Sequence, residues 1–180
     1  GTATPSTTDE GFLWYDENDT PPTPKFWDGA AFQALTSGKI LQVVRATDST
    51  DRTTSSGTYV DVTGMSVSIT PTKTTSAVLV LALFVSNVYD GSSSLAEGLY
   101  QITDSSNNPS SGAQEAEHRI DVSGGSGVTT RGPLIIAGYA TPGTTSSVTY
   151  KLRFRQISAT SVTVRNSKNT GQMYAMEVSA

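Results

Sequence analysis

Two short aromatic segments near the start of the chain most constrain what it can fold into. They read DEGFLWYD, residues 9–16, and KFWDGAAFQAL, residues 25–35, and a Pro-rich turn joins them. An isolated two-stranded hairpin is marginally stable in water. The aromatic side chains of this hairpin include Trp14, Tyr15, Phe26, Trp27 and Phe32. Aromatic surface of this extent predicts packing against a partner.

The same hairpin resembles a short repeat of bacteriophage tail fibres. The shared features are GFLWYD, a polar turn, and KFWDG with an aromatic residue behind it. In that family three identical chains wrap such hairpins around a common axis, so the resemblance implies a homotrimer. The chain departs from the repeat at NDTPPTP, residues 18–24, where the family has a shorter Asn-rich turn. It departs again at Phe32, where Trp is commoner.

Composition favours an extracellular structural or binding protein. The chain has 180 residues, of which 36% are hydrophobic and 16% are charged. Ser and Thr together make up 51 positions, so few strong helix formers remain. No cysteine is present to form disulfides or thiolate metal sites. A net charge of −4 disfavours electrostatic binding of nucleic acid or anionic lipid.

The chain lacks the marks of membrane insertion and of a signal peptide. The longest apolar run, Ala77 to Val85, has about half the length that a membrane-spanning helix needs. No basic stretch followed by an apolar segment opens the chain. Because the first residue is Gly and a fibre-type repeat follows almost at once, we expect a C-terminal piece of a longer polypeptide.

A domain boundary is predicted near Thr36-Ser37-Gly38, between a hairpin segment (1–37) and a larger domain (38–180). In the larger domain, β-branched and aromatic runs alternate with turns at intervals of roughly 8 to 12 residues, as in a sandwich or barrel. Ten strands are predicted, at residues 39–46, 58–62, 65–70, 77–86, 95–103, 115–122, 128–139, 147–156, 161–165 and 172–178.

The apolar pattern along these strands predicts which faces are buried. Residues 65–70 and 150–155 alternate between apolar and polar side chains, which is typical of strands with one face in water. The run from Ala77 to Val85 does not alternate. We therefore expect the opposite sheet to cover one side of it, and a neighbouring subunit or the hairpin to cover the other.

The larger domain carries a second resemblance. GTYVDVTGMSVSITP (57–71), SAVLV (76–80) and MYAMEV (173–178) resemble the C-terminal domain of phage and prophage fibre proteins. The resemblance implies an all-β fold, with an N-terminal aromatic β-hairpin followed by an antiparallel jelly-roll-like β-sandwich, assembled as a trimer. In this interpretation Gly64 supplies a tight bend between two paired strands, and Pro71 ends the second.

Catalytic and metal sites find little support in the sequence. His118 is the only histidine; on a strand, Glu115, Glu117 and Asp121 share one face and His118 points to the other. No G-x-S-x-G motif accompanies the serines, and no paired carboxylates indicate a glycosidase. Residues 16–19 and 48–51 supply oxygen ligands that calcium accepts, but Asp beside Ser or Asn is also ordinary turn chemistry. We expect no enzyme activity, no cofactor and no metal.

Loops on a rigid sandwich remain as candidate recognition sites. Aromatic, amide, carboxylate and guanidinium groups suit sugars, because rings stack on apolar sugar faces and planar polar groups bond paired hydroxyls. The candidates are Tyr89, Asp90, Asn107, Asn108 and Arg131. With the resemblance, they imply a phage tail-fibre domain on the virion surface that binds a bacterial glycan or protein receptor and contacts other virion proteins.

Two other functions stay open at this point. A capsid decoration or head-fibre protein would use the same sandwich without binding a receptor. A carbohydrate-binding module would belong to a larger hydrolase.

Overall fold

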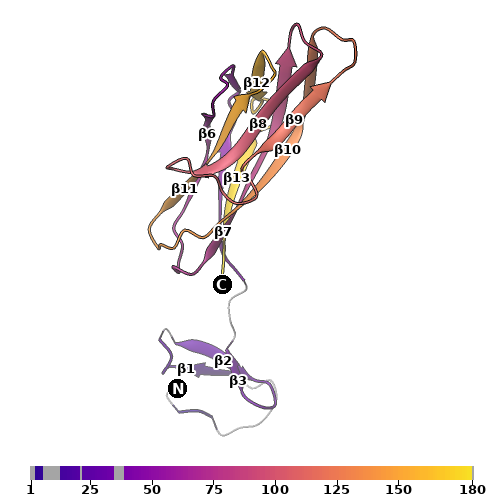
Figure 1. The fold of residues 1–180 in the computed structure, drawn as a ribbon. Coiled ribbons are helices and arrows are strands. Elements are labelled where there is room, and N and C mark those ends of the chain that lie inside the picture. The colour runs from indigo at the N-terminus through magenta and orange to yellow at the C-terminus, as the bar shows by residue number, and fades with distance from the viewer. Residues whose placement is uncertain (1–2, 6–12, 21, 35–38, 180) are drawn as a thin grey trace. The chain divides into compact units, whose positions relative to one another are not determined.

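The structure is a computed structural model that describes residues 3–5, 13–20, 22–34 and 39–179. It divides into two compact units, Gly1–Gly38 and Lys39–Ala180, a boundary one residue after the predicted one. All regular elements of the described residues are β-strands (Figure 1). The first part of the DEGFLWYD motif, residues 9–12, and the junction at residues 36–38 lie outside the described residues.

No helix long and apolar enough to span a membrane is found in the described part of the chain.

Unit 1 contains a three-stranded antiparallel sheet of β1 (Leu13–Asp16), β2 (Thr23–Trp27) and β3 (Phe32–Ala34). The predicted hairpin is present as β1 and β2, but KFWDGAAFQAL breaks into two strands, so the sheet has a third strand that the prediction missed. The break is a turn in which Asp28 Oδ1 accepts hydrogen bonds from the amides of Ala30 (2.9 Å) and Ala31 (2.8 Å). Gly29 follows Asp28 with φ +95°, a conformation that favours glycine.

The aromatic side chains of unit 1 divide between the two faces of its sheet. Phe32 makes edge contacts with Trp14 and Trp27, each with ring centroids 5.2 Å apart. On this face Lys25 also pairs with Asp16 at 2.6 Å, which lowers the pKa of that carboxyl. By strand alternation Tyr15 and Phe26 lie on the opposite face with Leu13. Leu13 and Tyr15 remain 67% and 53% exposed, so this second face is open.

Trp27→Ala is expected to unfold unit 1 while the sandwich stays intact. The variant loses one aromatic edge contact and part of a buried ring, roughly 2 to 3 kcal/mol in total. Both tryptophans of the chain lie in unit 1, so the remaining Trp14 reports on this unit alone. In denaturant its emission should shift to longer wavelength at a lower concentration, while the far-ultraviolet circular dichroism transition keeps its midpoint. A parallel loss of both signals would contradict the independence of the units.

Unit 2 is a sandwich of two antiparallel sheets. One sheet contains β4 (Ile40–Asp48), β5 (Arg52–Thr54), β7 (Ala77–Asp90), β10 (Val128–Ala140), β12 (Ser161–Val164) and β13 (Gly171–Val178). The other contains β6 (Val60–Ile69), β8 (Leu95–Asp104), β9 (Ala116–Asp121) and β11 (Val148–Gln156).

The pairing of the strands is that of a jelly roll. The first strands of unit 2 pair with its last strands: β4 pairs with β13, and β5 pairs with β12. Moving inward along the chain, β6 pairs with β11, β7 with β10, and β8 with β9. The first sheet thus runs β4-β13-β7-β10 and the second β6-β11-β8-β9. This arrangement confirms the predicted jelly-roll-like sandwich.

Two local predictions in unit 2 were wrong. Residues 58–62 and 65–70 belong to one strand, β6, and Gly64 lies in a bulge of that strand, where the register against β11 shifts between Lys151 and Arg153. Gly64 has φ +91°, and a Cβ there would come within 2.5 Å of Asp48 Oδ1. The short strand β5 was missed because RTT offers no apolar alternation.

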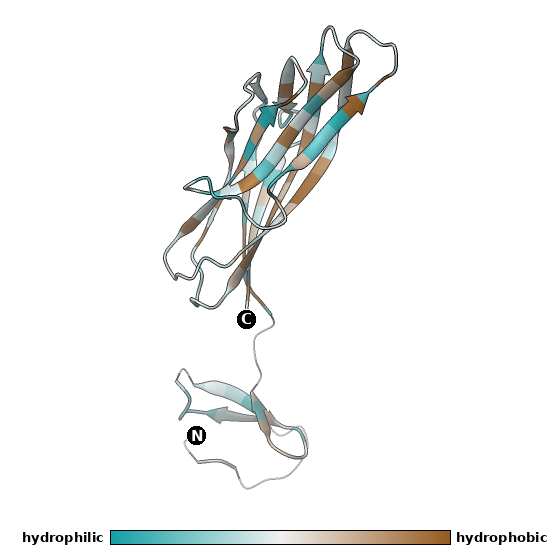
Figure 2. Ribbon diagram, in the orientation of Figure 1, coloured by the Kyte–Doolittle hydropathy of each residue, from teal (hydrophilic) through white to brown (hydrophobic). Residues whose placement is uncertain are grey.

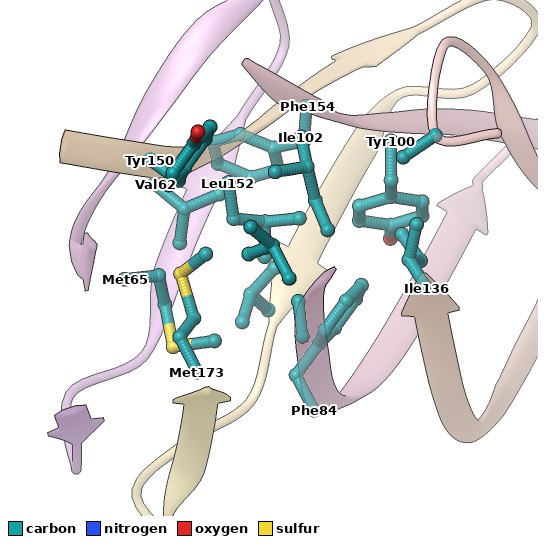
Figure 3. Packing of buried hydrophobic residues seen from close by; sticks show 14 of the residues in the cluster. Val62, Met65, Phe84, Tyr100, Ile102, Ile136, Tyr150, Leu152, Phe154 and Met173 are labelled. Carbon is teal, nitrogen blue, oxygen red and sulfur yellow. The ribbon is translucent and has the colours of Figure 1, made fainter. Parts of the chain in front are cut away.

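The core lies between the two sheets. Met65, Val67 and Ile69 of β6, with Tyr150, Leu152 and Phe154 of β11, are buried, as their alternation predicted. Figure 3 shows Phe84, Tyr100, Ile102 and Met173 meeting them from the other strands. Along β7, side chains 78, 80, 82 and 84 are buried, whereas 79, 81, 83 and 85 are half-buried. Within the described residues of unit 2, the apolar run is therefore fully covered on one side only.

One carboxylate is buried at the edge of this core. Glu177 of β13 is fully buried and accepts hydrogen bonds from Gln42 Nε2 at 2.6 Å and from the amide and hydroxyl of Thr72, both at 2.8 Å. Burial raises the pKa of Glu177, but these hydrogen bonds outweigh it and lower the pKa to about 2. The ionised side chain thus ties the turn after β6 to the last strand.

The sandwich has two ends, which we name by the residues that lie there. The near end holds Ile40, where β4 begins, together with Ala77, Asp104, Ala140 and Val178. The far end holds Asp90, Leu95, Asp121 and Val128. Residues 78 and 90 of β7 are separated by roughly 40 Å, since a strand rises about 3.3 Å per residue.

Candidate functional site

The outer face of the sheet β4-β13-β7-β10 is mainly apolar in its near half, where Arg45 is the charged side chain of the rows. Residues paired directly across strands share a face, so the register defines rows. One row contains Val43, Met176, Leu79 and Tyr139, and the next contains Arg45, Tyr174, Leu81 and Ala137. Ile135 beside Leu83 is 70% exposed, and Val43 and Tyr139 are 55% and 49% exposed. Figure 2 shows hydrophobic residues recurring along the strands of this unit.

A shallow pocket of about 270 Å³ opens on the same face. Leu83, Val85, Pro133 and Ile135 form its apolar wall, and Asn169, Thr170 and Gln172 form its rim. The near half, which we call the apolar half-face, thus combines flat apolar rows with a recess. Sequence reasoning found its β7 side chains but missed Ile135 and Tyr139, whose position depends on the β7–β10 register.

The far half of this outer face, which we call the polar half-face, has a different composition. One row contains Thr53, Thr163, Asn87 and Arg131, and the next contains Ser161, Tyr89 and Thr129. Asn87 Oδ1 accepts hydrogen bonds from Thr129 Oγ1 and Arg131 Nε, each at 3.4 Å. Tyr89 and Arg131, two sequence-predicted candidates, therefore lie on adjacent strands with Asn87 between them.

Asp90, another candidate, serves the loop that follows it. Its Oδ1 accepts hydrogen bonds from the amides of Ser92 at 2.9 Å and Ser93 at 2.6 Å, and its Oδ2 accepts one from Thr160 Oγ1 at 3.3 Å. These amides lower the pKa of the Asp90 carboxyl. By strand alternation its side chain leaves β7 on the side opposite Tyr89. Asp90 thus fixes the far-end loop and is not part of the polar half-face.

Asn107 and Asn108 lie at the near end, far from Tyr89 and Arg131. Asn107 has φ 71°, a left-handed conformation that asparagine tolerates in turns. Asn108 lines a pocket of about 310 Å³ with Asp104, Pro109, Pro142 and Tyr150. Asp104 in turn accepts hydrogen bonds from the Asn108 amide and side chain at 2.9 and 2.8 Å. The five predicted candidates therefore do not form one site.

His118 points inward from β9, on the face opposite Glu117 and Asp121, as predicted. Its Nδ1 lies 2.6 Å from Ser86 Oγ, and Ser86 is hydrogen-bonded to the Tyr100 hydroxyl. Burial lowers the pKa of His118. Because Ser86 is fully buried, its hydroxyl is not presented to a substrate in solution. The trio instead links β7, β8 and β9.

The proposed calcium ligands have protein partners. Asp16 pairs with Lys25, while Asp48 accepts a hydrogen bond from Asn166 Nδ2 at 2.9 Å and lies 3.6 Å from Arg52. Asp51 Oδ1 accepts a hydrogen bond from the Ser167 amide at 2.8 Å. Within the described residues, no three histidine, cysteine, aspartate or glutamate side chains gather as a metal site would require.

The opposite sheet has a charged outer face. Asp61 of β6 pairs with Lys151 at 2.9 Å and Arg153 at 2.8 Å on β11. Arg155 pairs with Glu115 at 3.1 Å and lies over the Tyr59 ring, 4.9 Å from its centroid. Charges on this face are thus largely matched by neighbours, whereas the outer face of β4-β13-β7-β10 has an apolar half.

No protein-family model matches this sequence, and no curated protein matches it. Among solved structures, the chain is similar to the tripod from the baseplate of bacteriophage Tuc2009, with 15% identity and a TM-score of 0.34 over 76% of this chain and 64% of that one. It is also similar to the VP2 protein of infectious bursal disease virus, with 12% identity and a TM-score of 0.32 over 84% of this chain and 40% of that one.

A third similar structure is the CBM22-1 xylan-binding domain from Paenibacillus barcinonensis Xyn10C. It shares 11% identity with a TM-score of 0.32, over 82% of this chain and 99% of that one. The chain spans less than two thirds of the length of the first two proteins. At these TM-scores the likenesses assign neither a family nor a function.

Proposed function

We propose that the chain is a virion structural protein, a C-terminal domain of a phage tail fibre, that forms a homotrimer and attaches to the host cell surface without catalysis. The observation that carries the proposal is the apolar half-face. A monomeric protein rarely leaves contiguous apolar rows in water, and such rows mark interaction surfaces. The resemblance of the hairpin and of the sandwich strands to fibre proteins supports the same reading.

The dimensions of the apolar half-face suit contact with another copy. Eight residues of strand rise about 26 Å and four strands span about 14 Å, so its flat area is roughly 400 Å². This is about half of the ~800 Å² that each partner buries in a standard interface. Unit 1 adds a second apolar surface, on which Leu13 is 67% exposed beside Phe26. Two such surfaces on one chain favour an assembly of identical copies.

Attachment is assigned to the polar groups of the sandwich surface, where the recognition candidates lie. A trimer presents three copies of each group, and simultaneous contact raises overall affinity by roughly 100-fold or more when the geometry permits it. Weak individual sites are then sufficient for adhesion to a bacterial surface glycan or protein receptor.

The purified protein is expected to be a trimer that binds host cells. Size exclusion with light scattering should give three times the chain mass of 18.9 kDa. Fluorescently labelled trimer should bind intact host cells and compete with phage for them. A stable monomer would overturn the assembly, and absence of cell binding would overturn the adhesion. Specific attachment to capsids would support a decoration or head-fibre protein, and binding to plant polysaccharide alone would support a carbohydrate-binding module.

A further inference from the structure

The groups that the polar half-face offers to a ligand are hydrogen-bond donors. The Asn87 side-chain oxygen already accepts a hydrogen bond from Arg131, which leaves the amide N–H groups of Asn87 for a ligand. Arg131 is exposed, and no carboxylate among the described residues forms an ion pair with it. The hydroxyls of Thr53 and Thr163 bond each other at 2.9 Å at the edge of the row. A ligand matched to this surface is rich in acceptors and negatively charged.

Tyr89 adds an aromatic surface beside these donors. It is 42% exposed and lies one row from Arg131 on the adjacent strand. Its hydroxyl lies over Gly91, where a Cβ would come within 2.8 Å of the oxygen. A side chain at position 91 would therefore shift the Tyr89 hydroxyl. An exposed ring beside a guanidinium stacks on the apolar face of a sugar while the guanidinium binds an acidic group.

The nearest carboxylate does not oppose a negative ligand. Asp90 leaves β7 on the other side from Tyr89, and its oxygens are taken by Ser92, Ser93 and Thr160. The side chains of the two rows that define the polar half-face are otherwise uncharged, so Arg131 sets its local charge.

From this arrangement we infer that Tyr89, Asn87 and Arg131 form a binding site for acidic glycans. The guanidinium of Arg131 donates two hydrogen bonds to the carboxylate or phosphate of one sugar unit. Asn87 donates to a neighbouring hydroxyl, and Tyr89 stacks on the ring. This assignment rests on the proposed adhesive function and specifies the class of ligand that is bound. It excludes Asn107 and Asn108, which lie at the other end of the sandwich.

The test is affinity electrophoresis of the full chain in gels that contain matched polysaccharides. Polygalacturonate is compared with its neutral methyl ester, and phosphomannan with mannan, so that the two sources of negative charge are separated. Wild-type protein should be retarded by at least one acidic polymer and not by its neutral partner. Arg131→Gln and Tyr89→Ala should weaken the apparent affinity roughly 10-fold or more, as expected when a charge-assisted hydrogen bond or a stacking contact is lost.

Two further variants sharpen the result. Arg119→Gln removes an exposed arginine of β9 that pairs with Asp121 at 3.0 Å, so it changes net charge equally and should bind like wild type. Gly91→Ala should weaken binding by displacing Tyr89. Equal retardation by acidic and neutral polymers, no retardation at all, or full binding by Arg131→Gln would each overturn the site.

Assays of binding to host cells distinguish a failure of this site from a failure of the adhesive function. If acidic polymers retard wild type and Arg131→Gln equally while both bind host cells, the site is wrong and adhesion stands. If wild type binds acidic polymers but no cells, the site stands and adhesion fails.

Discussion

Ile135→Glu is expected to turn the proposed trimer into folded monomers. The side chain is 70% exposed within one chain, so the subunit itself should lose little stability. In an assembly that covers the apolar half-face, the same position would hold an uncompensated buried charge, which costs roughly 3 to 5 kcal/mol in each copy. Light scattering should then report one chain mass where wild type reports three, with circular dichroism unchanged.

Ser66→Glu is the matched control for Ile135→Glu. It introduces the same charge at an exposed position on β6, on the outer face of the other sheet, where Lys151 is its cross-strand neighbour. This variant should remain trimeric. If both variants assemble like wild type, the apolar half-face is not the contact between copies; if both dissociate, the effect is one of net charge and the assignment also fails.

Glu177→Gln is expected to cost about 3 kcal/mol of folding stability at pH 7. In the folded chain hydrogen bonds hold the pKa of Glu177 at about 2, compared with an ordinary value of 4.5, and each unit of difference corresponds to about 1.4 kcal/mol. The amide keeps one acceptor oxygen but turns an N–H₂ group toward the donors of Gln42 or Thr72. One buried donor then loses its partner, which is itself destabilising.

The direction of the pKa shift determines how the stabilisation by Glu177 changes with pH. The folded pKa lies below the unfolded one, so the stabilisation is complete above about pH 4.5 and is lost as the pH falls toward 2. Denaturant titrations should show wild type and Glu177→Gln converging in acid and separating at neutral pH. Glu115→Gln, which changes a 59% exposed carboxylate paired with Arg155, should cost less than about 1 kcal/mol at either pH. A pH-independent difference for Glu177→Gln would show that packing, and not ionisation, is responsible.

The alternation of apolar and polar residues, together with residue composition, was sufficient to predict most strands of the sandwich. Alternation in residues 65–70 and 150–155 gave the buried faces of β6 and β11 correctly. The same local signals failed where long-range contacts decide the backbone. Gly64 looked like a turn because glycine marks turns, but its neighbour is Asp48 of another strand, which no local pattern reveals. β5 has no periodicity of its own and exists only because β12 pairs with it.

The candidate site was predictable residue by residue but not as an arrangement. Aromatic and polar residues near turns pointed to Tyr89 and Arg131, which the β7–β10 register places on one face. The same reasoning chose Asn108, which lies at the opposite end, and Asp90, whose carboxylate is used by its own loop. Asn87 was missed because an amide in the middle of an apolar strand gives no signal until its cross-strand neighbour is known.

The long strands of the jelly roll also determine how the protein would carry a mechanical load. The chain enters the sandwich at Ile40, at the near end, whereas Tyr89 and Arg131 lie toward the far end, most of a strand length away. In the proposed assembly, tension between the fibre and a bound cell would then run along β7. The hydrogen bonds that join β7 to β10, β12 and β13 lie across this direction, so they are loaded in shear and resist together rather than opening one after another. In the proposed fibre, a domain that is attached to the fibre at one end and binds the cell at the other is suited to keep the particle bound against flow.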